Sequence, residues 1–295
     1  MTLPPGTLSA RSESKGRPRI FGVLNVTPDS FSDGGEHYDA DVAVAHAHQL
    51  VADGADWIDV GGESTAPGTS PIDPREEQRR VLPVVSALAA DGIGVSIDTY
   101  HASTARAAID AGARIVNDVY GSDPDMPAVI SGSGARYVLM HSFGEPTTPH
   151  AYNDVLAEVR DELLRRADAL IARGVAREQI VLDPGLGFSK APEENWVLLR
   201  GCSVLASTGY PVLIGTSRKR FVQRLVGERI ADRDLATAVT SALAAHAGAW
   251  AVRVHDVRAT RIALDVAGAW YSSAPERAQP ARAPERAQRV EGSRA

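Results

Sequence analysis

Residues 95–118 read VSIDTYHASTARAAIDAGARIVND, a stretch in which two short apolar runs flank a segment with helical periodicity. The first run stops at Asp98 and the second stops at Asn117. Between them, Ser103–Ala111 has the apolar spacing of a helix and is followed by Gly112, a residue typical of the position just after a helix. The stretch therefore predicts a strand, a helix and a second strand that runs parallel to the first.

The same pattern, an apolar run that ends abruptly at a polar residue, occurs eight times along the chain. The runs are Ile20–Leu24, Trp57–Val60, Val95–Ile97, Ile115–Val116, Tyr137–Met140, Ile180–Leu182, Val212–Ile214 and Val252–Val254. An open, doubly wound sheet usually carries a Gly-rich phosphate loop after its first strand, but Asn25 begins an NVTPD sequence there. Eight such units in about 255 residues favour an α/β fold of the (β/α)8 TIM barrel type, in which all strand ends meet at one rim.

Segments with helical periodicity separate the runs, and no hairpin signal intervenes. Asp73 is a plausible N-cap for the clearest of them, because acidic residues follow it in the first turn. The expected helices are Ala40–Asp53, Pro74–Ala90, Ser103–Ala111, Val155–Arg173, Leu235–Gly248 and Arg258–Ala269.

Composition bounds the class of protein. The chain has 295 residues, 44% of them apolar, and a net charge of −6, which gives no reason to expect nucleic-acid binding. No apolar stretch is long enough to span a bilayer, and Met1–Arg17 lacks the apolar centre of a signal peptide. Cys202 is the single cysteine, so it cannot form an internal disulfide, and we expect it to be a small buried residue. These features are typical of a cytoplasmic protein.

The sequence divides into one large domain and two polar ends. Residues 1–17 are expected to be a disordered leader, and residues 18–271 hold all of the strand and helix patterns. Residues 272–295 contain the hexapeptide APERAQ twice and almost nothing to bury, so they are expected to form a disordered tail.

Asp98, Asn117 and Asp183 follow three different apolar runs. A lone carboxylate at such a place is costly without a partner. Two carboxylates and an amide that face one another suit a heterocycle with adjacent donors and acceptors, such as an aminopyrimidinone. The alternative for each residue is a helix cap or a local ion pair.

Positive charge and hydroxyl donors gather after the last two runs. GTSRKR, residues 215–220, carries Ser217 and Lys219, and RVHDV, residues 253–257, carries Arg253 and His255. Barrels often bind phosphate with the loops after strands seven and eight, so this pair of segments predicts a phosphate or diphosphate site. No Ser or Cys is evidently paired with His255, which favours contact with an anion over a role as base.

The first run is followed by NVTPDSFSDGG, residues 25–35, which is longer than a simple connection requires. We expect it to act as a lid that brings Asp29 and Asp33 to the rim, where either carboxylate can hold Mg²⁺ beside a phosphate; the alternative is a flexible surface loop. His141 has no second histidine at metal-ligand spacing, so zinc is not expected.

Taken together, these segments resemble the dihydropteroate synthase family over about Arg19–Trp270. The matching blocks are NVTPDSFSDGG, GGESTAPG, SIDTY, VNDVYG, LMH, LDPGLGFSK, GTSRKRF and RVHDV. The resemblance implies a (β/α)8 barrel that is commonly a homodimer. It also implies the condensation of 6-hydroxymethyl-7,8-dihydropterin diphosphate with p-aminobenzoate, with release of pyrophosphate and with Mg²⁺ as cofactor.

The resemblance also implies roles for individual residues. The pterin contacts would be Asp98, Asn117, Asp183 and Lys219, with Met140 and Phe188 packed around the ring. The diphosphate contacts would be Asn25, Arg253 and His255, and Asn25 would also be a Mg²⁺ ligand. Asp33, the loop carboxylate expected from the residues themselves, is the second expected Mg²⁺ ligand. The p-aminobenzoate region would be formed by Thr65, Pro67, Lys219 and Arg220. The residues expected to carry catalysis are Asp98, Asp183, Lys219, Arg253 and His255.

Two positions depart from the family's pattern. Ala66 stands where the family usually has Arg, and Ser142-Phe143 follows LMH where a larger residue and often an Arg are common. One alternative is therefore a non-catalytic or specialised pterin-binding paralogue. Another is a pterin methyltransferase of the corrinoid type, which would not need the anion contacts after the last two runs.

Overall fold

The computed structural model describes residues 17–27, 36–63, 72–143, 148 and 150–272. Within these ranges, eight parallel strands form one sheet in the order β6-β5-β4-β3-β2-β1-β8-β7. The strands are β1 Arg19–Asn25, β2 Trp57–Gly61, β3 Val95–Asp98, β4 Ile115–Asp118, β5 Arg136–Met140, β6 Ile180–Asp183, β7 Leu213–Ile214 and β8 Ala251–Val254. A parallel bridge joins Leu182 of β6 to Val212, the residue just before β7, and so connects the two ends of this strand order. The sheet therefore closes on itself, and the predicted barrel is confirmed.

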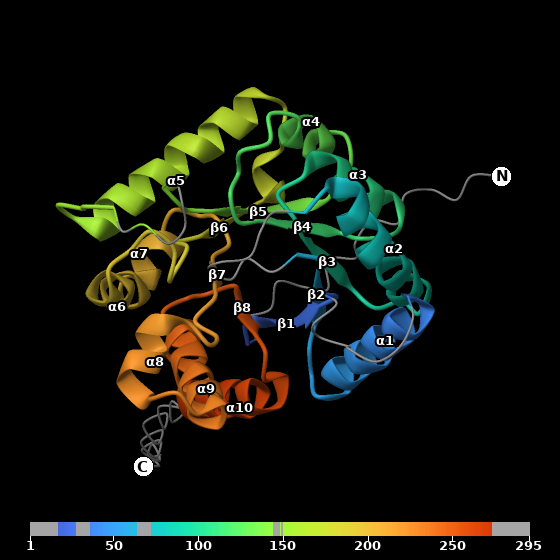
Figure 1. Cartoon of the computed structure of the whole chain (residues 1–295). Helices are drawn as coiled ribbons and strands as arrows, with labels where there is room; N and C mark the ends of the chain where they lie inside the picture. The colour runs from blue at the N-terminus through green and yellow to red at the C-terminus, as the bar shows by residue number, and fades with distance from the viewer. Residues whose placement is uncertain (1–16, 28–35, 64–71, 144–147, 149, 273–295) are drawn as a thin grey trace, which may run out of the picture.

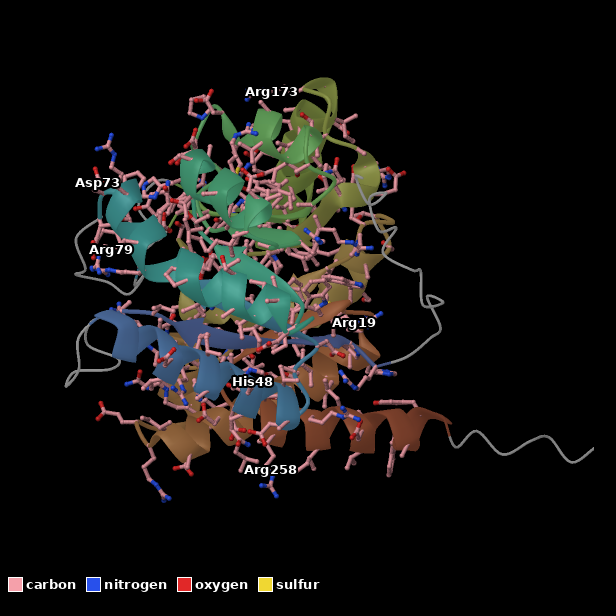
Figure 2. All side chains as sticks on the ribbon, turned by 90° about the vertical axis from the view of Figure 1, so that its right-hand side faces the viewer. Arg19, His48, Asp73, Arg79, Arg173 and Arg258 are labelled. Atoms are coloured by element: carbon pink, nitrogen blue, oxygen red, sulfur yellow. The ribbon has the colours of Figure 1, made fainter. Side chains whose placement is uncertain are left out.

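Helices surround the strands (Figure 1). They are α1 Glu36–Ala52, α2 Pro74–Ala90, α3 Ala102–Asp110, α4 Met126–Ser131, α5 Val155–Ala172, α6 Pro192–Arg200, α7 Cys202–Ala206, α8 Arg220–Val226, α9 Ile230–His246 and α10 Val257–Ser272. Helix α2 has the predicted bounds, and the side chain of its N-cap Asp73 accepts a hydrogen bond from Arg75 N. Figure 2 shows charged side chains on the outside of the ring, among them Arg79 on α2 and Arg258 on α10.

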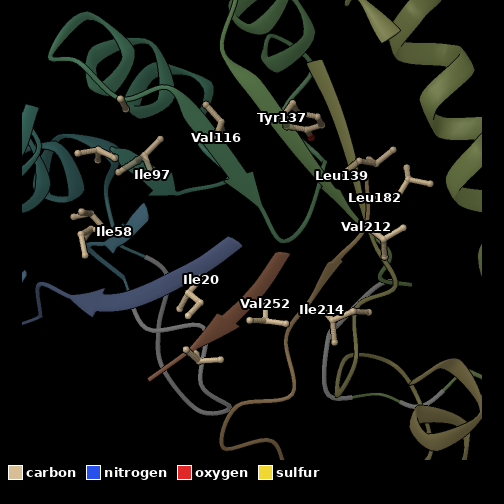
Figure 3. Close-up of a cluster of buried hydrophobic side chains, with 14 of the residues drawn as sticks. Ile20, Ile58, Ile97, Val116, Tyr137, Leu139, Leu182, Val212, Ile214 and Val252 are labelled. Atoms are coloured by element: carbon tan, nitrogen blue, oxygen red, sulfur yellow. The ribbon is translucent and has the colours of Figure 1, made fainter. Parts of the chain in front are cut away.

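Period-two alternation along the strands separates two apolar layers. Ile20, Ile58 and Val252 pack with the helices in the main core (Figure 3). Their neighbours Phe21 and Ala251 belong instead to a small cluster that fills the interior of the barrel. The interior cluster consists of Phe21, Ile115, Val138, Val181, Leu213 and Ala251, with Trp57 and Trp250 packed against it. The lower part of the barrel is thus a packed core and not a pore.

The next inward position along several strands is polar. On four strands, the residue two positions after the one that packs in the barrel interior is polar or charged. These residues are Asp59 on β2, Asn117 on β4, Asp183 on β6 and Arg253 on β8. The same alternation that fills the lower barrel therefore places charged groups above it, at the carboxyl ends of the strands.

Cys202 is fully buried, as predicted, and burial raises the pKa of its thiol to about 11. The predicted leader and tail lie outside the described residues, except for Arg17 and Ser272. In the part of the chain that the structure describes, no helix has both the length and the apolar character needed to cross a membrane.

Candidate active site

The carboxyl ends of the strands open into one cavity. Its walls come from β3, β4, β5, β6 and β8 and from the loops after β4, β6 and β7. The lining residues are Asp98, Asn117, Val119, Met140, Asp183, Gly185, Leu186, Phe188, Gly215, Lys219 and Arg253. The structure therefore brings together residues that are up to 155 positions apart in the sequence, as the strand-end pattern predicted.

Arg253 links two carboxylates at the floor of the cavity. Its Nε donates to Asp59 Oδ2 and one terminal nitrogen donates to Asp98 Oδ2, both at 2.6 Å. Asn117 Nδ2 donates to the same oxygen of Asp59 at 3.1 Å. Asp59 is fully buried, so these charge-assisted bonds offset the cost of removing its carboxylate from water.

Asp98 has fewer hydrogen-bond donors than Asp59, the other carboxylate that Arg253 contacts. Burial raises the pKa of Asp98 to about 7, and the neighbouring Asp59 adds to the increase while Arg253 opposes it. One guanidinium cannot fully compensate two buried carboxylates, and Asp59 also has the amide of Asn117. The proton therefore resides on Asp98 more readily than on an exposed aspartate.

Asp183 is held by the loop that follows β6. Gly185 N donates to Asp183 Oδ1 at 2.7 Å, and burial is the main cause that raises the pKa of this carboxyl. Lys219 Nζ lies 3.8 Å from the centroid of the Phe188 ring. Burial, together with the charge of Arg253, lowers the pKa of Lys219 to about 8, although Asp183 and Asp98 favour its charged form.

His255 is paired with a serine, contrary to the expectation from the sequence, which was wrong on this point. Ser217 Oγ lies 2.9 Å from His255 Nδ1 and also accepts from His255 N at 3.1 Å. Burial, followed by the charges of Arg253 and Arg218, lowers the pKa of His255 to about 3. The imidazole is therefore neutral at physiological pH, and the serine fixes its orientation.

One wall of the cavity is apolar. Val119, Met140 and Phe188 form a buried cluster against which Tyr100 and Tyr120 pack. A flat ring that enters the cavity therefore meets polar groups from the strand ends and an apolar surface from this cluster, which is the usual composition of a small-molecule site.

The remaining predicted residues lie apart from the cavity or outside the described ranges. Asn25 stands exposed at the end of β1, where it pairs with Gly61 of β2. Gly61 lies between Asn25 and Asp98: a Cβ built on Gly61 would lie 3.7 Å from Asn25 Oδ1 and 3.6 Å from Asp98 Cβ. Arg220 is exposed and lines a separate surface hollow with Arg224 of α8. Outside the described residues are Asp29, Asp33, Thr65, Ala66 and Pro67.

The sequence interpretation singled out Arg253 but missed two buried residues, Asp59 and Lys190. Asp59 and Arg253 each interrupt an apolar strand, and these strands flank β1 on its two sides. Opposite charges inside two strands of one barrel were a usable signal for a buried ion pair, but Asp59 was not singled out. Lys190, the last residue of the LDPGLGFSK block, is buried and was given no role.

A barrel whose strand ends combine a paired arginine, buried aspartates and an apolar wall has the donors, acceptors and apolar surface that suit a polar, flat ligand. The family model described as pterin binding enzyme matches residues 21–255 of this chain.

The relatives narrow the class further. Dihydropteroate synthase from Mycobacterium leprae is 52% identical over 270 residues, which cover 88% of this chain and 95% of that protein. The structure of Xanthomonas albilineans dihydropteroate synthase with 4-aminobenzoic acid matches with a TM-score of 0.83 and 42% identity, covering 88% and 94% of the two chains. The complex of that enzyme with 7,8-dihydropteroate matches with a TM-score of 0.80 and 40% identity, covering 88% and 95%. The chain belongs to the dihydropteroate synthase family.

Proposed function

We propose that this chain is a dihydropteroate synthase of folate biosynthesis. It joins 6-hydroxymethyl-7,8-dihydropterin diphosphate to p-aminobenzoate and releases pyrophosphate. The observation that carries the proposal is the meeting of Asp98, Asn117, Asp183 and Lys219 in one cavity beside an apolar wall. The solved relatives that contain 4-aminobenzoic acid and 7,8-dihydropteroate support the same substrates.

The polar groups of the cavity suit the edges of a pterin. Asp98 and Asp183 accept hydrogen bonds from ring and exocyclic N–H groups when they are ionised. The bond from Asn117 Nδ2 to Asp59 fixes the amide, so that its oxygen can accept from a ring N–H. Phe188 and Met140 then pack against the faces of the ring.

The reaction needs no covalent nucleophile. The bond between the pterin methylene carbon and the diphosphate oxygen breaks, and the amine nitrogen of p-aminobenzoate bonds to that carbon. The carboxylates of Asp98 and Asp183 stabilise positive charge that develops on the pterin methylene. The arylammonium that forms is acidic and loses its proton without a dedicated base.

Cations and neutral donors stabilise the departing diphosphate. The guanidinium of Arg253 has five N–H donors, and Asp59 and Asp98 take two of them in the described structure. We propose that a remaining donor of Arg253, the Lys219 ammonium and the neutral imidazole of His255 contact the diphosphate. Ser217 keeps the imidazole in the orientation that this contact requires.

Mg²⁺ is proposed as the cofactor, with Asn25 and Asp33 as its protein ligands. The exposed amide of Asn25, which Gly61 separates from Asp98, is a hard oxygen donor at the strand ends, and such a donor fits this ion. The described ranges contain no group of three or more His, Cys, Asp or Glu side chains that could hold a metal on its own. Proteins usually bind Mg²⁺ through one or two carboxylates plus substrate phosphates. When bound, the ion would neutralise charge on the diphosphate.

The direct test of the function is a pyrophosphate assay. Purified protein with Mg²⁺ is expected to release pyrophosphate when both substrates are present and to release none when either is omitted. Tight binding of the pterin diphosphate without pyrophosphate release would contradict the proposal and would favour the non-catalytic paralogue.

We also propose that residues 18–271 form one domain and that the protein is cytoplasmic. Two copies of this domain associate through α9 and α10. Each of these helices exposes an apolar stripe with a spacing of four residues, and the stacked rings of His246 and Tyr271 join the helices at one end. The stripes consist of Leu235, Val239 and Leu243 on α9 and Ile262, Val266 and Trp270 on α10, all more than half exposed. Two such neighbouring stripes form the kind of apolar patch that soluble monomers seldom leave uncovered.

The association predicts a mass of twice 31.2 kDa in light scattering. The double variant Val239→Asp/Val266→Asp is expected to be a monomer, because it places charges in the middle of both stripes. Val51→Asp on α1 serves as the control, since Val51 is a partly exposed apolar residue on another helix, and it is expected to leave the mass unchanged. A monomeric parent protein at micromolar concentration would contradict the association.

A further inference from the structure

Lysine is rare in this chain, and of its few lysines one lines the cavity and another is buried behind it. The sequence has 31 Lys and Arg residues, of which the lysines are Lys15, Lys190 and Lys219. Lys219 lines the cavity, whereas Lys190 is 8% exposed behind it, at the end of the loop after β6. A buried lysine in a chain that otherwise uses arginine calls for a physical reason, because its ammonium loses hydration.

The amine of Lys190 joins two strand ends. Its Nζ lies 3.0 Å from Gly185 O and 2.9 Å from Phe188 O, which belong to the loop after β6. It also lies 3.1 Å from His141 Nδ1 and 3.3 Å from His141 O, just after β5. These acceptors surround a single point, a geometry that suits a compact amine better than the planar fork of an arginine.

The loop held in this way carries two residues of the cavity. Gly185 has a φ of +65°, and a Cβ there would lie 1.9 Å from His141 O, so its backbone packs directly against the end of β5. From this position Gly185 N donates to the carboxylate of Asp183. Three residues further on, the ring of Phe188 lies against Lys219 Nζ.

We propose that Lys190 is a positioning residue: its amine fixes the loop after β6 against β5 and thereby orients the Asp183 carboxylate and the Phe188 ring toward the pterin. This inference rests on the proposed function for the identity of the ligand. Lys190 does not line the cavity, so its effect passes through the loop and not through contact with a substrate.

The hydrogen bonds of Lys190 Nζ can form whether the amine is charged or neutral. Burial lowers the pKa of Lys190 to about 7, while Asp183 and Glu194 favour its charged form and Lys219 opposes it. His141 stays neutral, because burial and the charge of Lys190 lower its pKa to about 3. A charged Lys190 donates to His141 Nδ1, and a neutral amine accepts from the other tautomer, so both states keep their bonds to the carbonyls of Gly185 and Phe188.

The test compares Lys190→Met with Gln179→Met. Gln179 stands before β6 at the opposite end of the barrel, and its Nε2 donates to Ile130 O and Ala135 O. Both variants therefore lose side-chain bonds to backbone carbonyls near the same strand. Both are expected to unfold at a lower temperature, but only Lys190→Met is expected to raise the KM for the pterin diphosphate by about tenfold. The KM for p-aminobenzoate is expected to stay within about twofold in both.

An unchanged pterin KM in Lys190→Met, or an equal rise in Gln179→Met, would overturn the proposal. If Lys190→Met does not fold, Lys190→Arg replaces it, and we expect the same direction of change because a planar fork cannot reach the same acceptors.

Amide hydrogen exchange of residues 185–189 without substrate separates this inference from the proposed function. Exchange there is expected to be faster in Lys190→Met and unchanged in Gln179→Met, even if the parent protein releases no pyrophosphate. Equal exchange in Lys190→Met and the parent protein would refute the positioning role.

Discussion

Arg253→Met is expected to lower the free energy of unfolding by about 3 kcal/mol, because it leaves two buried carboxylates without their cation. Asp59 is fully buried and the Asp98 side chain is 10% exposed, and Arg253 contacts both at 2.6 Å. The Arg253 side chain is itself 23% exposed toward the cavity, which places the expected loss at the low end for a broken buried pair. Equilibrium unfolding in urea measures the change.

Arg261→Met is the matched control for this variant. Arg261 pairs with Asp265 on α10 at 2.8 Å, but both side chains are substantially exposed, so the expected loss is at most about 1 kcal/mol. Losses of similar size in the two variants would contradict the view that Arg253 is the central cation of the barrel.

Asp98→Asn is expected to reduce kcat/KM for the pterin diphosphate by about 100-fold at pH 8, because the amide cannot replace a charged acceptor. The raised pKa of Asp98, about 7, makes the effect depend on pH. Below that pH the parent protein binds a proton at Asp98 and loses the same acceptor, so its own kcat/KM falls as the pH is lowered. At pH 6 the two proteins should therefore differ by only about tenfold.

Asp56→Asn provides the control for the pH profile. Asp56 lies before β2 at the opposite end of the barrel, where it accepts from Arg17 and from Ile20 N. This variant is expected to keep the pH profile of the parent protein. A profile for Asp98→Asn that retains the fall below pH 7 would show that another group titrates there.

The barrel and the convergence of its strand ends were predictable because they depend on local patterns. A parallel strand that is buried on both faces is a short apolar run, and each run here stops where the chain leaves the core. Asp98, Asn117 and Asp183 mark those stops, so their meeting follows once the strands close into a barrel. The limits of α2 were also predictable, because Asp73 caps the helix and Pro74 occupies its first turn.

Other features depend on contacts that a single sequence does not display. Helix α9 begins at Ile230 and not at the predicted Leu235. Asp232 and Arg233 follow Ile230 and Ala231 in its first turn and interrupt the apolar period, so the sequence pattern did not show this start. The pairing of Ser217 with His255 joins two loops 38 positions apart. Lys190 stands in a loop, where its type alone suggests exposure, and only the positions of Gly185, Phe188 and His141 explain its burial.

The measurement that tests the central claim most directly is a crystal structure of this protein with 6-hydroxymethyl-7,8-dihydropterin diphosphate and Mg²⁺. The heterocycle should lie within hydrogen-bond distance of Asp98, Asn117 and Asp183, with the diphosphate on the side of Arg253 and His255. A pterin bound elsewhere, for example in the surface hollow at Arg220 and Arg224, would contradict the account.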